Sequence, residues 1–432
     1  MIVLICRVIG FEMPYWKALV WFLTITSVFM SASYTMLVPF LPMYLIDELG
    51  VAQSDVNIWS GLIFSISFLI SAIMAPIWGA LSDKKSHKAM AVRAAVCLAI
   101  SYIWGGFVQT PWELFAMRSF QGFSAGLWPA CLAIMTSTAP REKMGWCLGL
   151  MQGGSTAGGV FGPMIGGILA EFFGMRASFY FAGAALGMIA LGLIFFIKGE
   201  EQKKIAKSAD KKKSGGSLKL LKVPVIQRML FAAGVVQLAV MLVQPVLPLY
   251  IAELQGSMDN IVMVSGIVFS VVGISGIFAA PMWGRLGTNI GYRWTLYVAL
   301  LGGGLFGVIQ AIPAAITPFV IWRFVGGIFM AGIFPAINSL LAENTLPNER
   351  GRVYGLSYAA QQVGSVAGPI AGGLMATYWN NSLVVMAHGF VMILLVVMLY
   401  LKRPKNQDPG NGEQINTEAS EPAENPPAPK QN

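Results

Sequence analysis

The sequence predicts an all-helical integral membrane protein in which twelve transmembrane helices form two similar bundles of six. Of the 432 residues, 56% are hydrophobic and only 11% are charged, whereas a soluble globular domain carries about 25% charged residues. Apolar segments long enough to cross a bilayer core of about 30 Å recur along the chain. Short motifs of the first half also recur in the second half. This composition excludes an ordinary soluble enzyme, a disordered chain and a nucleic-acid-binding protein.

Breaks at polar, proline and glycine clusters divide the chain into twelve apolar segments. These are residues 17–45, 57–80, 89–108, 111–138, 144–171, 175–198, 225–253, 261–285, 292–312, 315–344, 351–378 and 382–402. The 48 glycines fit this interpretation, because glycine lets membrane helices approach one another closely. The four cysteines show no C-x-x-C spacing, so we expect no disulfide framework, no metal site and no cofactor.

Basic residues concentrate in the loops on one side of these segments. The loops after the second, fourth, eighth and tenth segments contain Lys84, Lys85, Lys88, Arg141, Lys143, Arg285, Arg350 and Arg352. The loops on the other side contain mainly acids: Asp47, Glu48, Asp55, Glu113, Glu171, Glu253 and Asp259. Because cytoplasmic loops carry an excess of Lys and Arg, we expect both termini in the cytoplasm. The net charge of +9 is therefore a signal of topology rather than of a nucleic-acid partner.

Composition also predicts the domain organisation. Residues 1–198 form an N-terminal six-helix bundle, 199–223 a basic cytoplasmic linker, 224–405 a C-terminal six-helix bundle and 406–432 a disordered tail. No cleavage site follows the short apolar run at the start, so we expect no signal peptide, and translation can begin at Met1 or at Met13.

An internal repeat relates the two bundles. The segment APIWG at 75–79 recurs as APMWG at 280–284, and Arg118 recurs as Arg323. The segment GPMIGG at 162–167 recurs as GPIAGG at 368–373. Parallel repeats of this kind build transporters whose site lies between the halves, near the bilayer midplane.

With these motifs the sequence resembles the major facilitator superfamily, and within it the twelve-spanning drug:proton antiporters of bacteria. The segment GALSDKKSHK at 79–88 is similar to the loop motif between the second and third spans. The resemblance implies that Asp83 pairs charges at a cytoplasmic gate, with Lys88 in the same motif, and that Gly79 lets helix ends approach. Ser86 and His87 replace the usual Gly and Arg. The alternative is a solvated charged loop.

A second motif, FAMRSFQG at 115–122, is similar to the antiporter motif of the fourth span. The resemblance assigns Arg118, with Gln121 and Gly122, to proton coupling. An arginine inside the membrane is costly and should face a cavity or a partner. The alternative is a structural arginine that reaches toward Glu113.

The third motif, GGVFGPMIGG at 158–167, resembles the fifth-span motif that this family associates with antiport. Its residues are Gly158, Gly162, Pro163, Gly166 and Gly167. Small residues four apart make a flat helix face, and proline bends the helix. Because the motif recurs in the second half, helix packing is the alternative.

Efflux of amphipathic compounds needs a large apolar cavity with a few polar groups. The residues that we expect to line it are Tyr34, Met36, Gln152, Gln237, Gln244, Asn338, Tyr354, Tyr358, Gln361 and Gln362. Hydrogen bonds between helices are the alternative for each of these polar residues. No acid lies plainly in the middle of a span, so the coupled proton has only Asp83, Glu113, Glu343 and His388 as candidates.

The function expected from this resemblance is export of amphipathic or apolar drug-like compounds by proton antiport in the bacterial cell membrane. The expected partners are a small-molecule substrate, protons and the lipid bilayer, with no nucleic acid, and the chain should act as a monomer. An exporter or uptake carrier for a metabolite, such as a sugar or a siderophore, is the alternative. We do not expect an enzyme, because no metal-ligand set, Ser/His/Asp set or P-loop is present.

Overall fold

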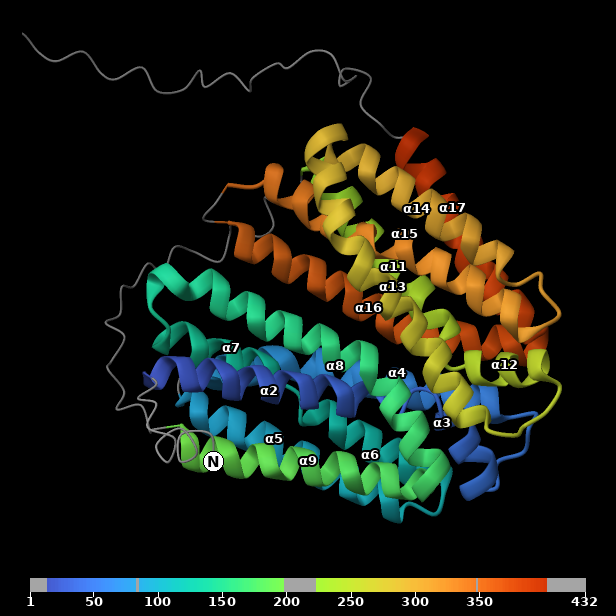
Figure 1. Ribbon diagram of the computed structural model, residues 1–432, viewed down its shortest axis with the longest axis horizontal. Coiled ribbons are helices and arrows are strands. Elements are labelled where there is room, and N and C mark those ends of the chain that lie inside the picture. Colours follow the sequence, from blue (N-terminus) through green and yellow to red (C-terminus); the bar gives the residue numbers. More distant parts are fainter. Residues whose placement is uncertain (1–13, 83–84, 198–222, 347–348, 402–432) are drawn as a thin grey trace, which may run out of the picture.

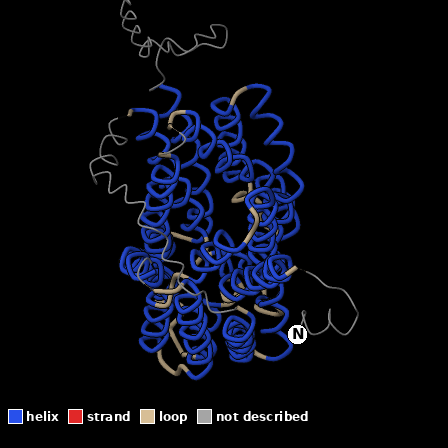
Figure 2. Tube along the Cα trace, turned by 90° about the vertical axis from the view of Figure 1, so that its left-hand side faces the viewer, coloured by secondary structure: helices blue, strands red, loops and turns tan. Residues whose placement is uncertain are grey.

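The computed structural model describes residues 14–82, 85–197, 223–346 and 349–401 (Figure 1). All long elements in these residues are helices, and no strand occurs among them (Figure 2). The predicted tail, nearly all of the predicted linker, both candidate start residues and Asp83 lie outside the described residues.

The first half of the chain forms eight α-helices with two short helical turns between them. They are α2 (Tyr15–Thr35), α3 (Leu41–Met43), η1 (Tyr44–Glu48), α4 (Val56–Ser82), α5 (His87–Phe107), α6 (Pro111–Phe123), α7 (Leu127–Thr138), η2 (Arg141–Lys143), α8 (Met144–Phe173) and α9 (Met175–Phe196). The second half repeats this order with α11 (Pro224–Val243), α12 (Leu247–Gln255), α13 (Ile261–Ile290), α14 (Tyr292–Ile309), α15 (Ile316–Glu343), α16 (Arg350–Tyr378) and α17 (Asn381–Leu401).

Ten helices of the described residues are long and apolar enough to cross a membrane. The remaining two predicted spans correspond to α6 followed by α7, and to α16, which is rich in glycine, serine, tyrosine and glutamine. The structure therefore confirms the predicted fold class of twelve spans in two similar halves.

Three predicted spans are not continuous helices. Helix α2 ends at Thr35, four residues before Pro39, because a proline nitrogen has no hydrogen to donate to the preceding turn. The seventh span breaks in the same way between α11 and α12, around Pro245. The fourth span breaks at Gly126, whose φ of 116° no regular helix accommodates.

The two halves lie one beside the other. In Figure 1 the first half, coloured blue to green, lies below the second half, coloured yellow to red. Within the first half α2 packs on α8 and α5 on α9, and the second half repeats these pairs as α11 on α16 and α14 on α17. The internal repeat of the sequence is therefore a repeat of helix packing.

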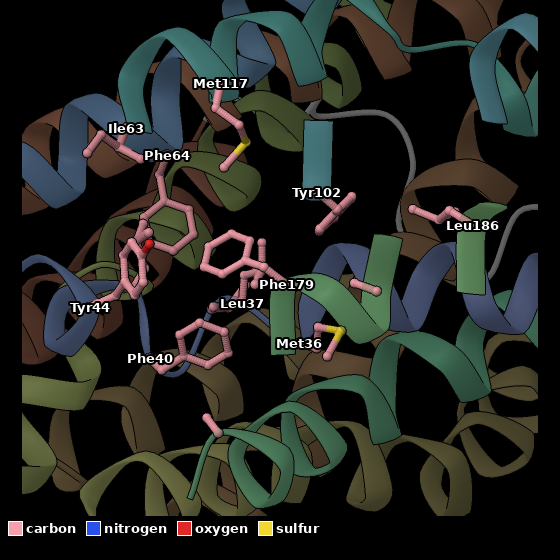
Figure 3. Close-up of a cluster of buried hydrophobic side chains, with 14 of the residues drawn as sticks. Met36, Leu37, Phe40, Tyr44, Ile63, Phe64, Tyr102, Met117, Phe179 and Leu186 are labelled. Atoms are coloured by element: carbon pink, nitrogen blue, oxygen red, sulfur yellow. The ribbon is translucent and has the colours of Figure 1, made fainter. Parts of the chain in front are cut away.

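An aromatic cluster fixes one end of the first half (Figure 3). The ring of Phe179 packs edge-on against Phe40 at 5.9 Å and tilted against Tyr44 at 5.1 Å between centroids. The Tyr44 hydroxyl donates a hydrogen bond of 3.0 Å to the carbonyl of Gly105. In the second half Tyr250 takes the same place, against Phe319 at 5.4 Å. The helix breaks after α2 and α11 thus place equivalent tyrosines in equivalent cores.

Candidate functional site

Helices α4 and α16 bring the two halves into backbone contact at one end of the molecule. A Cβ atom on Gly61 would lie 2.5 Å from the carbonyl oxygen of Pro369, and one on Gly373 would collide with the carbonyl of Asn57. The Ser65 hydroxyl donates a hydrogen bond of 2.8 Å to Val366 in the same contact. Only glycine permits this approach, because any side chain would push the helices apart.

Helices α8 and α13 make the equivalent contact on the other side of the molecule. A Cβ atom on Gly167 would lie 2.7 Å from the carbonyl oxygen of Val262, and one on Gly266 would collide with the carbonyl of Pro163. These positions correspond in the repeat to those of the α4 and α16 contact. We call the end of the molecule that contains these two contacts the closed end.

The same four helix faces make no contact at the opposite end. A helix returns to the same face after 18 residues, which is five turns and about 27 Å. Each contact glycine has a second glycine 18 residues away on the same helix. The pairs are Gly61 and Gly79, Gly373 and Gly355, Gly167 and Gly149, and Gly266 and Gly284. A Cβ atom on the second glycine of any pair would meet nothing within 4 Å. The halves therefore diverge toward what we call the open end.

A proline separates the two glycines on each of these four helices. Pro76, Pro163, Pro281 and Pro369 all lie inside their helices. Each removes one backbone hydrogen bond and permits a bend between the part that touches the other half and the part that does not.

The third motif divides its glycines between two partners. Gly158, Gly162 and Gly166 face the backbone of α2 within the first half. Gly167 instead faces α13 of the other half, and the carbonyl of Pro163 faces Gly266 there. The motif therefore serves both packing within one half and the contact between the halves.

The loop motif lies at the open end. Gly79 has open space around it, and Lys88 begins the first turn of α5. The Lys88 ammonium donates hydrogen bonds of 2.7 Å and 2.5 Å to the carbonyls of Ile194 and Ile197. Lys88 therefore caps the last turn of α9, where a positive charge is favourable.

Arg118 lies inside the first half, and no carboxylate of the described residues forms an ion pair with it. It is 2% exposed, and its Nη1 donates a hydrogen bond of 2.9 Å to Oε1 of Gln121. Its Nε and Nη2 atoms have no hydrogen-bond partner among the described residues. The alternative partner from the sequence, Glu113, instead accepts a hydrogen bond of 2.9 Å from the backbone of Gln109. Gly122 lets α6 approach the backbone of α4 at Ser67.

The ten predicted cavity residues separate into three groups. Tyr34, Gln152, Asn338, Tyr354 and Tyr358 are exposed, whereas Gln237, Gln244, Gln361 and Gln362 are half-buried. Gln237 donates a hydrogen bond of 3.0 Å to Ser365, so it joins α11 to α16. Met36 is 5% exposed and packs against Gly166 in the core of the first half, because the chain turns after Thr35. Tyr34 and Tyr358 come from different halves and lie within electrostatic range of each other.

His388 is a structural residue in this arrangement. Its Nδ1 donates a hydrogen bond of 2.8 Å to the carbonyl of Ala239 and joins α17 to α11. Two residues of the site were not predicted from the sequence. Gly61 makes the contact of α4 with the other half, and Tyr102 lies beside Arg118. The repeat contains a signal for the first, since Gly61 corresponds to Gly266.

Two repeated six-helix halves with these motifs define a class of membrane transporter, and sequence comparison identifies the family. The sequence model of the Major Facilitator Superfamily matches residues 23–279 and 229–428. The chain belongs to the Major Facilitator Superfamily of membrane transporters.

Among curated proteins the chain is similar to two proteins named multidrug resistance protein MdtG. It is 35% identical to that of Proteus mirabilis over 370 residues, which cover 84% of this chain and 90% of the relative. It is 34% identical to that of Klebsiella pneumoniae over 382 residues, which cover 87% and 91%.

Solved structures share the fold at low sequence identity. A bacterial homologue of the human lysosomal transporter Spinster, in an inward-facing and occupied conformation, has a TM-score of 0.78 at 15% identity, over 90% of this chain and 97% of that one. The nucleoside transporter NupG has a TM-score of 0.75 at 15% identity, over 89% of this chain and 100% of that one.

Proposed function

We propose that this protein exports amphipathic or apolar drug-like compounds across the bacterial cell membrane in exchange for protons. The observation that carries the proposal is the arrangement of the glycine pairs, since four helices touch the other half at one end and separate from it at the other. An arrangement of this kind gives a central site access to one side of the membrane at a time. The similarity to two multidrug resistance proteins supports the substrate class.

The open end faces the cytoplasm in this proposal. Lys85, Lys143 and Arg352 lie at the open end, whereas Asp55, Glu253 and Asp259 lie at the closed end. An excess of basic residues marks the cytoplasmic side. The conformation is then inward-open, as in the Spinster homologue of similar fold.

Export requires the opposite conformation as well. We propose that the halves rock until Gly79 and Gly149 approach the second half near Gly355 and Gly284, while the closed end separates. Open space at these four glycines leaves room for this movement. Hydrogen bonds such as that from Ser65 to Val366 are then exchanged for contacts at the other end.

Transport in liposomes tests this proposal. The purified protein is reconstituted with an imposed pH gradient, and ethidium fluorescence and lumenal pH are followed together. Proton antiport predicts dye movement that depends on the gradient and is accompanied by proton counterflow. Dye movement that is indifferent to the gradient, and unchanged in Arg118→Ala, would contradict the coupling.

Two motif variants sharpen the liposome experiment. Asp83→Asn and Pro163→Ala are expected to abolish gradient-driven movement while expression and folding stay close to the unmodified protein. Normal transport by either variant would mean that its motif serves packing alone. Gly187→Ala is the matched control, because a Cβ there meets nothing within 4 Å.

A further inference from the structure

Three buried side chains around Arg118 present hydrogen-bond donors without acceptors. Arg118, Tyr102 and Gln121 are 2%, 2% and 4% exposed. Arg118 Nε and Nη2, the Tyr102 hydroxyl and Gln121 Nε2 have no hydrogen-bond partner among the described residues. Of the two acceptors in the cluster, Gln121 Oε1 is already bound to Arg118, and the Tyr102 hydroxyl oxygen lies beside the Gln121 side chain.

The charge of this cluster is not balanced by the protein. No carboxylate of the described chain lies within ion-pair distance of Arg118. Apart from the amide oxygen of Gln121, the ring of Phe64 faces the guanidinium, with its centroid 5.8 Å away. A guanidinium in the membrane interior without a counter-charge is costly, and each unsatisfied buried donor adds to that cost. A ligand with a negatively charged oxygen group would balance the charge and accept the unsatisfied hydrogen bonds.

The second half shows that these donors are not a requirement of the fold. Arg323 repeats Arg118, but Gly307 and Gly326 stand at the positions of Tyr102 and Gln121. There the Arg323 Nε donates to the carbonyl of Val268 at 3.3 Å, and Gly307 leaves room for α17. The fold therefore accommodates this arginine without further donors beside it. The donors of Tyr102 and Gln121 are a feature of the first half alone.

Tyr34 connects the cluster with the region between the halves. It lies within electrostatic range of Arg118 and is 38% exposed. It packs edge-on against Phe68 at 6.1 Å and is near Tyr358 of the other half. The rings of Tyr34 and Phe68 therefore present an apolar surface beside the cluster.

We propose that Arg118, Tyr102 and Gln121 form a subsite for the anionic oxygen group of the transported compound, such as a carboxylate. Arg118 supplies the charge and two donors, while Tyr102 and Gln121 each supply one more. An amphipathic anion is then bound more tightly than a neutral compound of the same shape. This inference rests on the proposed function for the existence of an amphipathic substrate.

A matched pair of fluorescent probes tests the inference by equilibrium binding. The full-length protein in phosphatidylcholine nanodiscs is titrated with 1-pyrenebutyrate and with its neutral amide, and binding to empty nanodiscs is subtracted. The carboxylate is expected to bind about ten- to hundredfold more tightly than the amide, as charge-assisted hydrogen bonds would give.

Variants assign the preference to the cluster. Arg118→Gln is expected to bring the two affinities together by weakening the carboxylate while the amide is unchanged. Arg118→Lys retains part of the preference, and Tyr102→Phe weakens the carboxylate by severalfold. Arg323→Gln is the control and keeps the full preference. A preference that survives Arg118→Gln would overturn the proposal, as would equal binding of both probes by the unmodified protein.

Competition distinguishes a substrate group from a free inorganic anion. Chloride and inorganic phosphate are added to the bound carboxylate probe, and neither is expected to displace it, since neither has an apolar body. Displacement by either ion at concentrations comparable to the probe would make the cluster an inorganic anion site and overturn the inference. The binding assay needs no gradient, so its outcome is independent of the liposome experiment on export.

Discussion

Lys88 shows how a motif residue can have a structural role at the scale of a single side chain. Its ammonium binds the carbonyls of Ile194 and Ile197, which have no partner inside their own helix. Lys88→Met is expected to destabilise the protein by about 1.5–3 kcal/mol, the range of a charged hydrogen bond. A lower midpoint of thermal unfolding in detergent measures this.

Lys85→Met is the control for this prediction, because Lys85 is exposed and belongs to the same basic segment. Equal midpoints for the two variants would mean that the hydrogen bonds of Lys88 contribute nothing to stability.

The break between α6 and α7 is the main difference between the halves at the scale of elements. The corresponding α15 runs without a break. Two carbonyls at the break accept hydrogen bonds from other elements: Trp78 donates to Phe123 at 2.8 Å, as Trp283 does to Ile328 in α15, and Arg93 donates to Ala125 at 2.9 Å. The guanidinium of Arg93 also lies 3.6 Å from the centre of the Trp78 ring.

Gly126→Ala should destabilise this break by about 1–2 kcal/mol, because its φ of 116° is costly for any residue with a Cβ. Gly187→Ala in α9 should leave stability unchanged or raise it slightly, since alanine is the better helix former. The two variants are compared by thermal unfolding in the same detergent. A Gly126→Ala protein as stable as Gly187→Ala would show that the break is not strained for alanine.

At the scale of the whole molecule, leucine substitutions at the two glycines of α4 are predicted to shift the conformational equilibrium in opposite directions. A leucine at Gly61 cannot fit against Pro369, so the closed end should separate. A leucine at Gly79 fits the present structure but would prevent the open end from closing. Gly61→Leu should therefore favour the outward-open conformation, and Gly79→Leu the inward-open one.

Spin-label distances measure this population shift in a variant without native cysteines. One label pair at Gln53 and Met258 reports the closed end, and one at Lys143 and Arg352 the open end. Gly61→Leu should lengthen the first distance and shorten the second, and Gly79→Leu should leave both close to the present structure. Identical distance distributions in the two variants would contradict the rocking movement.

Sequence patterns predicted the features that depend on residues close together in the chain. The spans follow from apolar runs, and the breaks near Pro39 and Pro245 follow from residues that cannot continue a helix. The burial of Met36 could not be predicted, because hydropathy shows that a residue is in the membrane but not which side of its helix faces a neighbour. Tyr102 was missed because it reaches Arg118 from another helix, with no spacing to signal it.

The sequence by itself determined that the chain is a membrane protein of two repeated six-helix halves. The reason is that the bilayer core imposes apolar length and internal hydrogen bonding on each span separately. Only the tertiary structure decided which end is closed, that Gly61 and Gly167 touch the other half, and that Arg118 lacks a counter-charge. These features depend on contacts between helices far apart in the chain, and two packings of the same halves can satisfy the same sequence.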